Sequence, residues 1–378
     1  MWRVLFVIGS TEVGGAEGQL VLLAEGLHRL GHEVHVYTLE KAGPLSQRLA
    51  AAGVHFSSGG YDRKRARPVK LAQLLASEIG LLRLMRRLRP DVVQAFLPLA
   101  NFSAAIMGRL AGAELIVTSK RALGTHLERV PWWRPFEGVA NRLSDVIVAN
   151  SEAVKQDAVR RERLAPDRLR VIFNGLEAGC FSRPSTDRAE LRQREGVGPE
   201  DFLILCVGNL IPYKGHLDLI AALGLLGALA TRVQLLIAGE DRGAGERLRA
   251  RARELGLEAR LHLLGRRSDI PELLAAADLF ALPSHEEGFS NALLEAMAAG
   301  RPILATAVGG NAEALDAGRC GKLVPPRDPA ALAAAIGELL QNESARMAMG
   351  TAARERARAR YGVAAMVAAH LELYGMEA

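Results

Sequence analysis

Short apolar runs of strand length alternate along the chain with longer segments whose apolar residues recur at helical spacing. The run RVLFVIG at 3–9 is followed by GAEGQLVLLAEGLHRLGHE at 15–33, whose helical pattern stops at Gly31. The next run, EVHVYTL at 33–39, is again of strand length. Because such runs are apolar on both sides and are separated by helices, they predict a parallel sheet covered by helices on both faces.

This alternation occurs twice. In the first half, further strands are predicted at 91–96, 114–119, 145–150 and 169–173. The turn signal Asn174-Gly175 and an irregular segment up to Pro199 then interrupt the pattern. In the second half, strands are predicted at 202–208, 233–239, 260–265, 278–283, 301–306 and 321–326. The predicted fold class is α/β, with two doubly wound parallel-sheet domains.

The interruption also sets the expected domain boundaries. We place the first domain at 1–173, a linker at 174–186 and the second domain at 187–360. The last segment, 361–378, has helical spacing and no strand after it, so we expect a C-terminal helix that packs back toward the first domain. A length of 378 residues also favours two domains of about 150 to 200 residues each.

Composition indicates a globular protein of a reducing compartment. No run reaches the ~18–20 apolar residues that a membrane-spanning helix needs. The start, MWRVLFVIGS, lacks a signal-peptide cleavage site and leads into Gly-Gly, so we interpret it as the first strand. The three cysteines show no C-x-x-C spacing, and Cys206 lies in the apolar run FLILCVG, where a small core residue is expected. We therefore expect a cytoplasmic location.

The net charge of +6 and the pI of about 9.5 require an explanation. Within 63–89, cations greatly outnumber acids: Arg63, Lys64, Arg65, Arg67, Arg83, Arg86, Arg87 and Arg89. A basic amphipathic helix can bind the surface of an anionic membrane, and it can equally be the solvated face of a helix that covers a sheet. Nucleic acid is not expected as a partner, because no recognised module or interleaved aromatic residues accompany the charge.

In an open parallel sheet, ligands bind at the carboxyl ends of the strands. The first such corner, STEVGGAEG, has Gly14 and Gly15, which allow close approach of a ligand to the backbone, although it can equally be an ordinary loop. The dinucleotide fingerprint G-x-G-x-x-G is absent. The matching corner of the second half has Lys214 at a predicted helix start. A cation is unfavourable there, so either an anion lies nearby or the lysine side chain bends into water.

The segment ALPSHEEGFSNALLEAMAAGRPILAT at 281–306 has two acids seven positions apart, Glu287 and Glu295. Ser290 or Asn291 can cap the predicted helix, which places Glu287 in the loop before it and Glu295 about one turn into it. The corner thus offers amide donors for phosphate and carboxylates for hydroxyl groups, the two kinds of group that a nucleotide sugar contains. Two helix-start acids that only stabilise the helix dipole are the alternative.

On these residues the chain resembles the retaining GT-B glycosyltransferases of family 4, whose E-x7-E region is similar to EEGFSNALLEAMAAGRPILAT. The resemblance extends over nearly the whole chain, through GGAE, ANSEAV, VIFNG, VGNLIPYKG, AAADLFALPS and GKLVPPRD in the family's order. It implies two Rossmann-like domains that face each other across a cleft, with the donor bound mainly by the second and the acceptor by the first.

The resemblance also implies roles for single residues. Glu287 would meet the transferred sugar, and Lys214 the diphosphate. The donor would further contact Gly15, Asn209, Arg267, Ile270, Gly288, Phe289, Ser290, Asn291 and Glu295, with Glu295 at the ribose, Gly15 at the phosphates, and Arg267 and Ile270 near the base.

The sequence departs from the family at the phosphate. Many relatives have an arginine shortly before the lysine, where this chain has Asn209 and Ile211. Either Lys214 carries more of the charge or Arg121 from the first domain contributes. His126 is the nearest match to the family's cleft histidine, although a histidine at the surface or core edge fits as well.

The resemblance implies transfer of a hexose from a UDP- or GDP-sugar to a glycan or lipid-linked acceptor, with retention. A front-face route is favoured, because no residue is an obvious nucleophile for a double displacement. No cofactor is expected. No metal site is expected either, since the chain has no Asp-x-Asp pair and no His or Cys cluster with metal-ligand spacing. A non-catalytic sugar-nucleotide-binding protein and a dinucleotide-dependent oxidoreductase are the alternatives.

Overall fold

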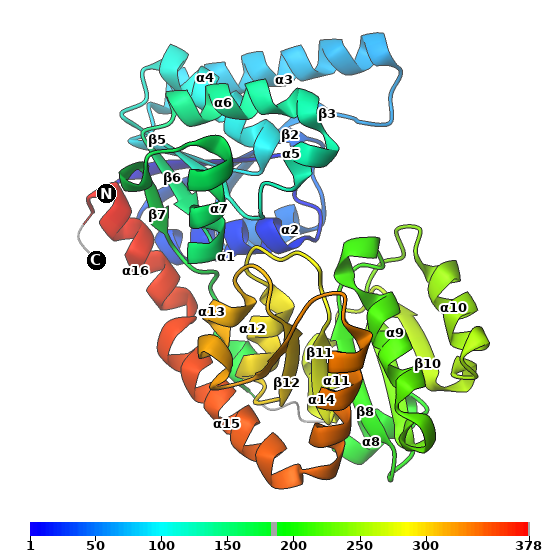
Figure 1. Ribbon diagram of the computed structural model, residues 1–378. Helices are drawn as coiled ribbons and strands as arrows, with labels where there is room; N and C mark the ends of the chain where they lie inside the picture. Colours follow the sequence, from blue (N-terminus) through cyan, green and yellow to red (C-terminus); the bar gives the residue numbers. More distant parts are fainter. Residues whose placement is uncertain (183–186, 377–378) are drawn as a thin grey trace. The chain divides into compact units, whose positions relative to one another are not determined.

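The computed structural model describes residues 1–182 and 187–376, which form two compact units. Unit 1 consists of Met1–Gly175 together with the segment that begins at Val363, and unit 2 consists of Leu176–Gly362. Each unit has its own parallel sheet with helices on both faces (Figure 1). The predicted fold class is confirmed. Part of the predicted linker, residues 183–186, lies outside the described residues.

The sheet of unit 1 has the strand order β3-β2-β1-β4-β5-β6-β7. Its strands are β1 (Arg3–Ile8), β2 (Glu33–Glu40), β3 (His55–Tyr61), β4 (Val92–Phe96), β5 (Leu115–Lys120), β6 (Val146–Ala149) and β7 (Leu169–Val171). The sequence did not predict β3. Its segment, HFSSGGY, has few apolar side chains, because an edge strand that pairs only with β2 is less buried than the central strands.

Helices cover both faces of this sheet. They are α1 (Gly15–Arg29), α2 (Leu45–Ala51), α3 (Arg67–Leu88), α4 (Pro98–Ala111), α5 (His126–Arg129), η1 (Pro131–Trp133), α6 (Arg134–Leu143), α7 (Glu152–Glu162), η2 (Pro166–Arg168) and α16 (Val363–Tyr374). Side chains alternate between faces along each strand. Phe6 of β1 therefore packs in the core with α1 and α16, whereas Leu5 and Val7 pack with α3 and α4.

Unit 2 has the strand order β10-β9-β8-β11-β12-β13. Its strands are β8 (Phe202–Val207), β9 (Val233–Ala238), β10 (Leu261–Gly265), β11 (Leu279–Leu282), β12 (Ile303–Thr306) and β13 (Lys322–Val324). Its helices are η3 (Ala178–Phe181), α8 (Arg188–Arg194), η4 (Pro212–Lys214), α9 (His216–Leu225), η5 (Gly227–Arg232), α10 (Gly245–Glu254), η6 (Glu258–Arg260), α11 (Ile270–Ala276), α12 (Asn291–Ala298), α13 (Asn311–Ala314), η7 (Asp316–Gly318), α14 (Pro329–Gln341) and α15 (Glu343–Arg360).

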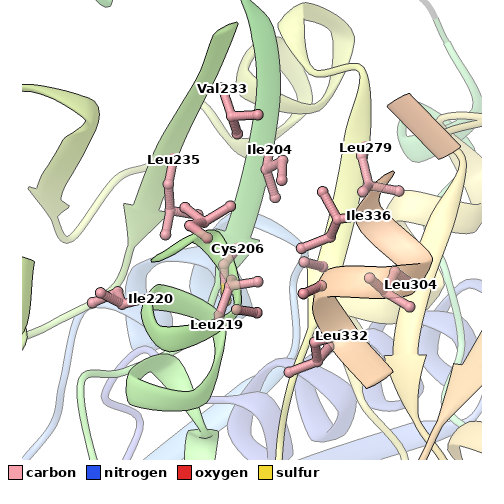
Figure 2. Close-up of a cluster of buried hydrophobic side chains, with 14 of the residues drawn as sticks. Ile204, Cys206, Leu219, Ile220, Val233, Leu235, Leu279, Leu304, Leu332 and Ile336 are labelled. Carbon is pink, nitrogen blue, oxygen red and sulfur yellow. The ribbon is translucent and has the colours of Figure 1, made fainter. Parts of the chain in front are cut away.

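One apolar core lies between the sheet of unit 2 and helices α9 and α14 (Figure 2). Ile204 and Cys206 of β8 contribute to it together with Leu219 of α9 and Ile336 of α14. Cys206 is buried in this core, as its apolar sequence context predicted. None of the helices in the described part of the chain is long and apolar enough to cross a membrane.

A buried polar network attaches α16 to the sheet of unit 1. The Tyr374 hydroxyl donates to Gln94 Oε1, and Gln94 Nε2 donates to Ser119 Oγ at 3.2 Å and to His370 Nε2 at 3.3 Å. His370 Nδ1 donates to the Met366 carbonyl at 2.8 Å. Burial lowers the pKa of His370 to about 4, so the imidazole is neutral at physiological pH and can accept the bond from Gln94.

This histidine predicts a loss of stability in mild acid. The unfolded chain takes up a proton near the ordinary pKa of 6.5, whereas the folded state does so only near 4. Stability is therefore complete above pH 6.5 and falls as the pH drops toward 4, by about 2 kcal/mol at pH 5. We expect His370→Gln, which keeps hydrogen-bonding groups but does not titrate, to lose less stability than the parent between pH 7.5 and pH 5 in urea unfolding. Identical pH dependence in the two proteins would contradict this assignment.

Candidate functional site

Two neighbouring strands of unit 2 end at the position where a ligand is expected. β8 and β11 lie side by side in the sheet, and the strand order reverses between them, which is the switch point where open α/β sheets bind ligands. Lys214 lies on the loop that leaves β8, and Glu287 lies on the loop that leaves β11. The fold thus brings together two residues that are 73 positions apart in the sequence.

Lys214 and Glu287 form an ion pair. Lys214 Nζ donates to Glu287 Oε1 at 2.6 Å, and the Ser284 hydroxyl donates to the same oxygen at 2.6 Å. The two ionic side chains are only 19% and 9% exposed, respectively. Burial alone would lower the pKa of Lys214, but the Glu287 carboxylate outweighs that effect and the pKa is raised. The anion expected beside Lys214 is therefore supplied here by the protein itself.

The loops that carry the pair touch through their backbones. Gly215 has φ +70°, and a Cβ at this position would lie 1.9 Å from the Pro283 carbonyl oxygen, so only glycine fits. The amide of His285 donates to the Tyr213 carbonyl at 2.7 Å, and His285 Nε2 lies 2.7 Å from Asp218 Oδ2. These contacts fix Lys214 and Glu287 relative to each other through the main chain.

A third loop, which leaves β12, packs against the backbone of Glu287. Gly309 has φ +50°, and a Cβ there would lie 1.7 Å from the Glu287 carbonyl oxygen. The amide of Gly310 donates to the Gly288 carbonyl at 3.0 Å. Asn311 Nδ2 donates to the Thr306 carbonyl at 3.0 Å and so braces the loop from its other end. The position of Glu287 thus depends on three loops.

Helix α12 follows directly and carries Glu295. Of the two candidate caps, Ser290 is the one that caps the helix, since its hydroxyl accepts from the Leu293 amide at 3.3 Å. Before it, Phe289 is buried and packs edge-on against Tyr361, with ring centroids 5.4 Å apart. Loss of solvation, and secondly the charge of Glu177, raise the pKa of Glu295 to about 7. Its carboxyl can therefore both donate to and accept from a hydroxyl group near neutral pH.

The other predicted donor contacts lie in the same unit. Asn209 follows β8; its Oδ1 accepts from the Glu240 amide at 3.3 Å, and its carbonyl accepts from His216 Nε2 at 3.2 Å. Arg267 follows β10, and Ile270 begins α11. Gly288 and Asn291 flank the turn into α12.

Arg267 is held by two carboxylates. Its Nε and NH2 donate to Asp269 at 2.7 and 2.6 Å, and its NH1 and NH2 donate to Glu195 at 3.1 and 2.8 Å. The hydrogen bonds to Asp269 and Glu195 raise the pKa of Arg267 above its ordinary value. Its charge is therefore compensated within the protein.

The candidates from the first half of the chain lie in unit 1. Gly15 begins α1. Arg121 follows β5, where its NH2 donates to Asn174 Oδ1 at 2.7 Å and its guanidinium lies 5.3 Å from the centroid of the Phe96 ring. Burial lowers the pKa of Arg121 to about 10, against the opposing charge of Glu17, and the side chain stays charged at neutral pH. His126 begins α5, and its side chain lies outside the described residues.

The sequence did not point to the residues that support Glu287. Ser284 lies in the segment 281–306 and Gly309 lies just after it, and the sequence pattern assigned neither of them a role. Their partners are far away in the sequence or use main-chain atoms, so spacing alone could not identify them. A clear signal was available only at Gly309, because a Gly-Gly pair after a buried strand often marks a close backbone approach.

Two family models match the chain in succession. The model described as Glycosyltransferase Family 4 matches residues 13–178, and the model described as Glycosyl transferases group 1 matches residues 187–356. The chain belongs to the group 1 glycosyltransferases of family 4, and its fold is the GT-B fold. It is thus an enzyme that transfers a sugar from a nucleotide sugar, and the enzyme class predicted from the sequence is confirmed.

Individual relatives agree with this family. D-inositol 3-phosphate glycosyltransferase of Corynebacterium glutamicum (strain R) is 29% identical over 376 residues, which cover 93% of this chain and 89% of the relative. The protein of the same name from Streptomyces scabiei (strain 87.22) is 29% identical over 392 residues, which cover 97% of this chain and 87% of that relative. The crystal structure of HepE from Anabaena in complex with UDP-glucose superposes with a TM-score of 0.87 at 25% identity and covers 99% of this chain and 100% of that chain.

The contact between Gly309 and Glu287 leads to a prediction. In Gly309→Ala the new methyl group must displace the Glu287 carbonyl, so we expect sugar transfer to fall at least tenfold, because small misplacements of catalytic groups are costly. The matched control is Gly256→Ala, which has the same left-handed conformation (φ +69°) but open space around it. Both variants share the left-handed backbone strain, and Gly309→Ala adds the steric clash, so it should melt at a lower temperature than Gly256→Ala. Transfer is therefore compared at a temperature at which both variants are folded. Equal transfer rates in the two variants would show that Gly309 does not position Glu287.

Proposed function

We propose that this glycosyltransferase moves a hexose from a UDP- or GDP-sugar to a glycan or lipid-linked acceptor, with retention of configuration, in the synthesis of a cell-surface polysaccharide or glycolipid. The observation that carries the proposal is the ion pair between Lys214 and Glu287 at the β8–β11 switch point. It holds a cation for phosphate and a carboxylate for hydroxyl groups within one hydrogen bond of each other.

The pair suggests which part of the donor each of the two side chains binds. A diphosphate is more highly charged than a single carboxylate and would draw Lys214 Nζ toward itself. Glu287, still held by Ser284, would then have acceptor capacity for hydroxyl groups of the sugar. Glu295, with its pKa near 7, would bind the ribose hydroxyls.

The remaining donor contacts are likewise assigned to separate parts of the donor, the diphosphate and the base. Gly288, Phe289, Ser290 and Asn291 shape the turn beside the diphosphate, and Asn209 stands where many relatives have an arginine. Four N–H bonds of Arg267 already go to Glu195 and Asp269, so its planar face, together with Ile270, is what it offers to the base.

Retention is proposed to follow a front-face route. The bond between the anomeric carbon and the diphosphate oxygen breaks as the acceptor oxygen bonds to the same face of that carbon. The acceptor proton passes to the departing phosphate oxygen. The protein would supply placement of the groups and a fixed positive charge at Lys214, which stabilises the leaving diphosphate.

Unit 1 is proposed to bind the acceptor, with Gly15 near the donor phosphates and with Arg121 and His126 as acceptor-side residues. The two curated relatives above are named for D-inositol 3-phosphate, so a polyol phosphate is the second acceptor class to assay. We also propose a cytoplasmic location, with contact to an anionic membrane surface through residues 63–89.

The two acids are expected to respond differently to substitution. Glu287→Ala should abolish most transfer while the fold persists, because the reacting sugar loses its carboxylate. Glu295→Ala should mainly raise the KM for the nucleotide sugar, because it loses ribose binding that is the same in the ground state and the transition state. Steady-state kinetics with UDP- and GDP-sugars test this, with circular dichroism as the control for folding. Equal, mild losses in both variants would instead indicate that the acids only stabilise α12.

Lys214 is expected to carry the charge of the diphosphate without a divalent metal. Removing one preorganised electrostatic donor costs ~10²–10³ in kcat, and Lys214→Ala should lose about that much. Lys322→Ala, which breaks a lysine ion pair with Glu338 elsewhere in unit 2, is the matched control and should keep its rate. The parent should remain active in excess EDTA. Activity that EDTA abolishes and Mg²⁺ or Mn²⁺ restores would show that a metal handles the charge.

A further inference from the structure

The exposed apolar side chains of the described residues are concentrated in one part of unit 1. Nine of the fourteen exposed large hydrophobic residues lie between positions 69 and 139. They are Val69, Leu71, Leu75, Ile79, Leu110, Val130, Trp132, Phe136 and Val139. Single exposed apolar residues are normal on a protein surface, but such a concentration indicates a surface that binds something.

Four aromatic rings form a cluster at one end of this region. Trp132 is 66% exposed and packs edge-on against Trp133 and Phe136, with ring centroids 5.3 and 6.3 Å apart. Phe136 in turn stacks on Trp133 at 5.0 Å and meets Phe102 of α4 edge-on at 5.1 Å. We call these four residues the aromatic cluster. Trp132 and Phe136 thus pack against other rings of the cluster while they remain exposed.

The aromatic cluster and α3 lie on the same side of unit 1. Leu81 and Met85 of α3 pack in one core cluster with Ala104 of α4, against one face of the sheet. Ala105 of α4 and Ala140 of α6 pack together on Ile116 of the same sheet. Helices α3, α4 and α6 are therefore neighbours in one layer (Figure 1). We call the outer side of α3, α4, η1 and α6 the basic–aromatic face.

Positive charge is in excess on this face, although one of its cations, Arg109, forms an ion pair with Asp145. The four elements contain eight cations, which are Arg67, Lys70, Arg83, Arg86, Arg87, Arg109, Arg134 and Arg142. They contain only two acids, Glu78 and Glu137. Neither acid offsets the surface charge. Glu78 Oε1 accepts from the Ser103 hydroxyl at 2.5 Å, and Glu137 is buried and accepts from Lys120 at 3.0 Å.

We propose that the basic–aromatic face binds the surface of an anionic lipid bilayer, with Trp132 and Phe136 inserted among the headgroups. Tryptophan prefers this zone because its ring is amphipathic, and arginines beside it are attracted to the negative lipid surface. A second copy of the chain is less suited, since the excess of positive charge would repel an identical face even though Arg109 is paired with Asp145. The proposal adds an aromatic anchor to the basic segment 63–89, and it does not depend on the donor chemistry.

The test measures sedimentation with vesicles of phosphatidylcholine alone and of phosphatidylcholine with phosphatidylglycerol. We expect the parent to bind only the anionic vesicles, and Trp132→Ser/Phe136→Ser to bind them at least tenfold more weakly. Changing Arg83, Arg86, Arg87 and Arg89 to Gln should also weaken binding and should reduce its dependence on salt. Because two of the three tryptophans of the chain lie in the aromatic cluster, the parent's fluorescence should shift to the blue on anionic vesicles.

Leu225→Ser/Met347→Ser is the matched control, since these residues of unit 2 are 62% and 68% exposed, which brackets Trp132. This variant should bind vesicles within twofold of the parent, and all variants should bind nucleotide as the parent does. Absence of parent binding to anionic vesicles overturns the proposal, and so does unchanged binding by Trp132→Ser/Phe136→Ser. A parent dimer that this variant breaks would instead assign the face to a second copy.

Discussion

The ion pair between Lys214 and Glu287 is the interaction on which the geometry of the candidate site depends. Both side chains are largely shielded from water, so each one lowers the free-energy cost of burying the charge of the other. The close approach of Gly215 to Pro283 and of Gly309 to Glu287 is what brings the two charges to 2.6 Å.

Unit 1 differs from unit 2 in where its polar and charged groups lie. Its interior is tied to α16 by neutral hydrogen bonds around Gln94, and its charge is displayed on the outside of α3 and α6. Unit 2 places its ion pair at the ends of β8 and β11. The two units therefore differ in whether their charged groups lie at the strand ends or on an outer helical face.

Much of the fold could be predicted because burial leaves a strong pattern in the sequence. The central strands read as continuous apolar runs, since both of their faces are covered. Strand β3 could not be predicted, because the edge strand HFSSGGY forms its backbone hydrogen bonds with β2 alone and has no apolar pattern. Among the candidate site residues, Lys214 was proposed from the unfavourable position of a cation at a helix start, and Glu287 and Ser290 were proposed from spacing and helix capping. The pairing of Lys214 with Glu287, and the supports Ser284 and Gly309, depend on which strands are neighbours, and local spacing does not encode that.

The most direct test of the central claim is a titration of nucleotide into the parent, Lys214→Ala, Glu287→Ala and the double variant. It uses UDP and UDP-glucose first and the guanosine compounds if these do not bind. If Lys214 meets the diphosphate and Glu287 the sugar, Lys214→Ala should weaken both ligands at least tenfold. Glu287→Ala should leave the free diphosphate within about twofold and weaken only the nucleotide sugar. Equal weakening of the free diphosphate by both single variants, or no weakening by Lys214→Ala, would contradict the account.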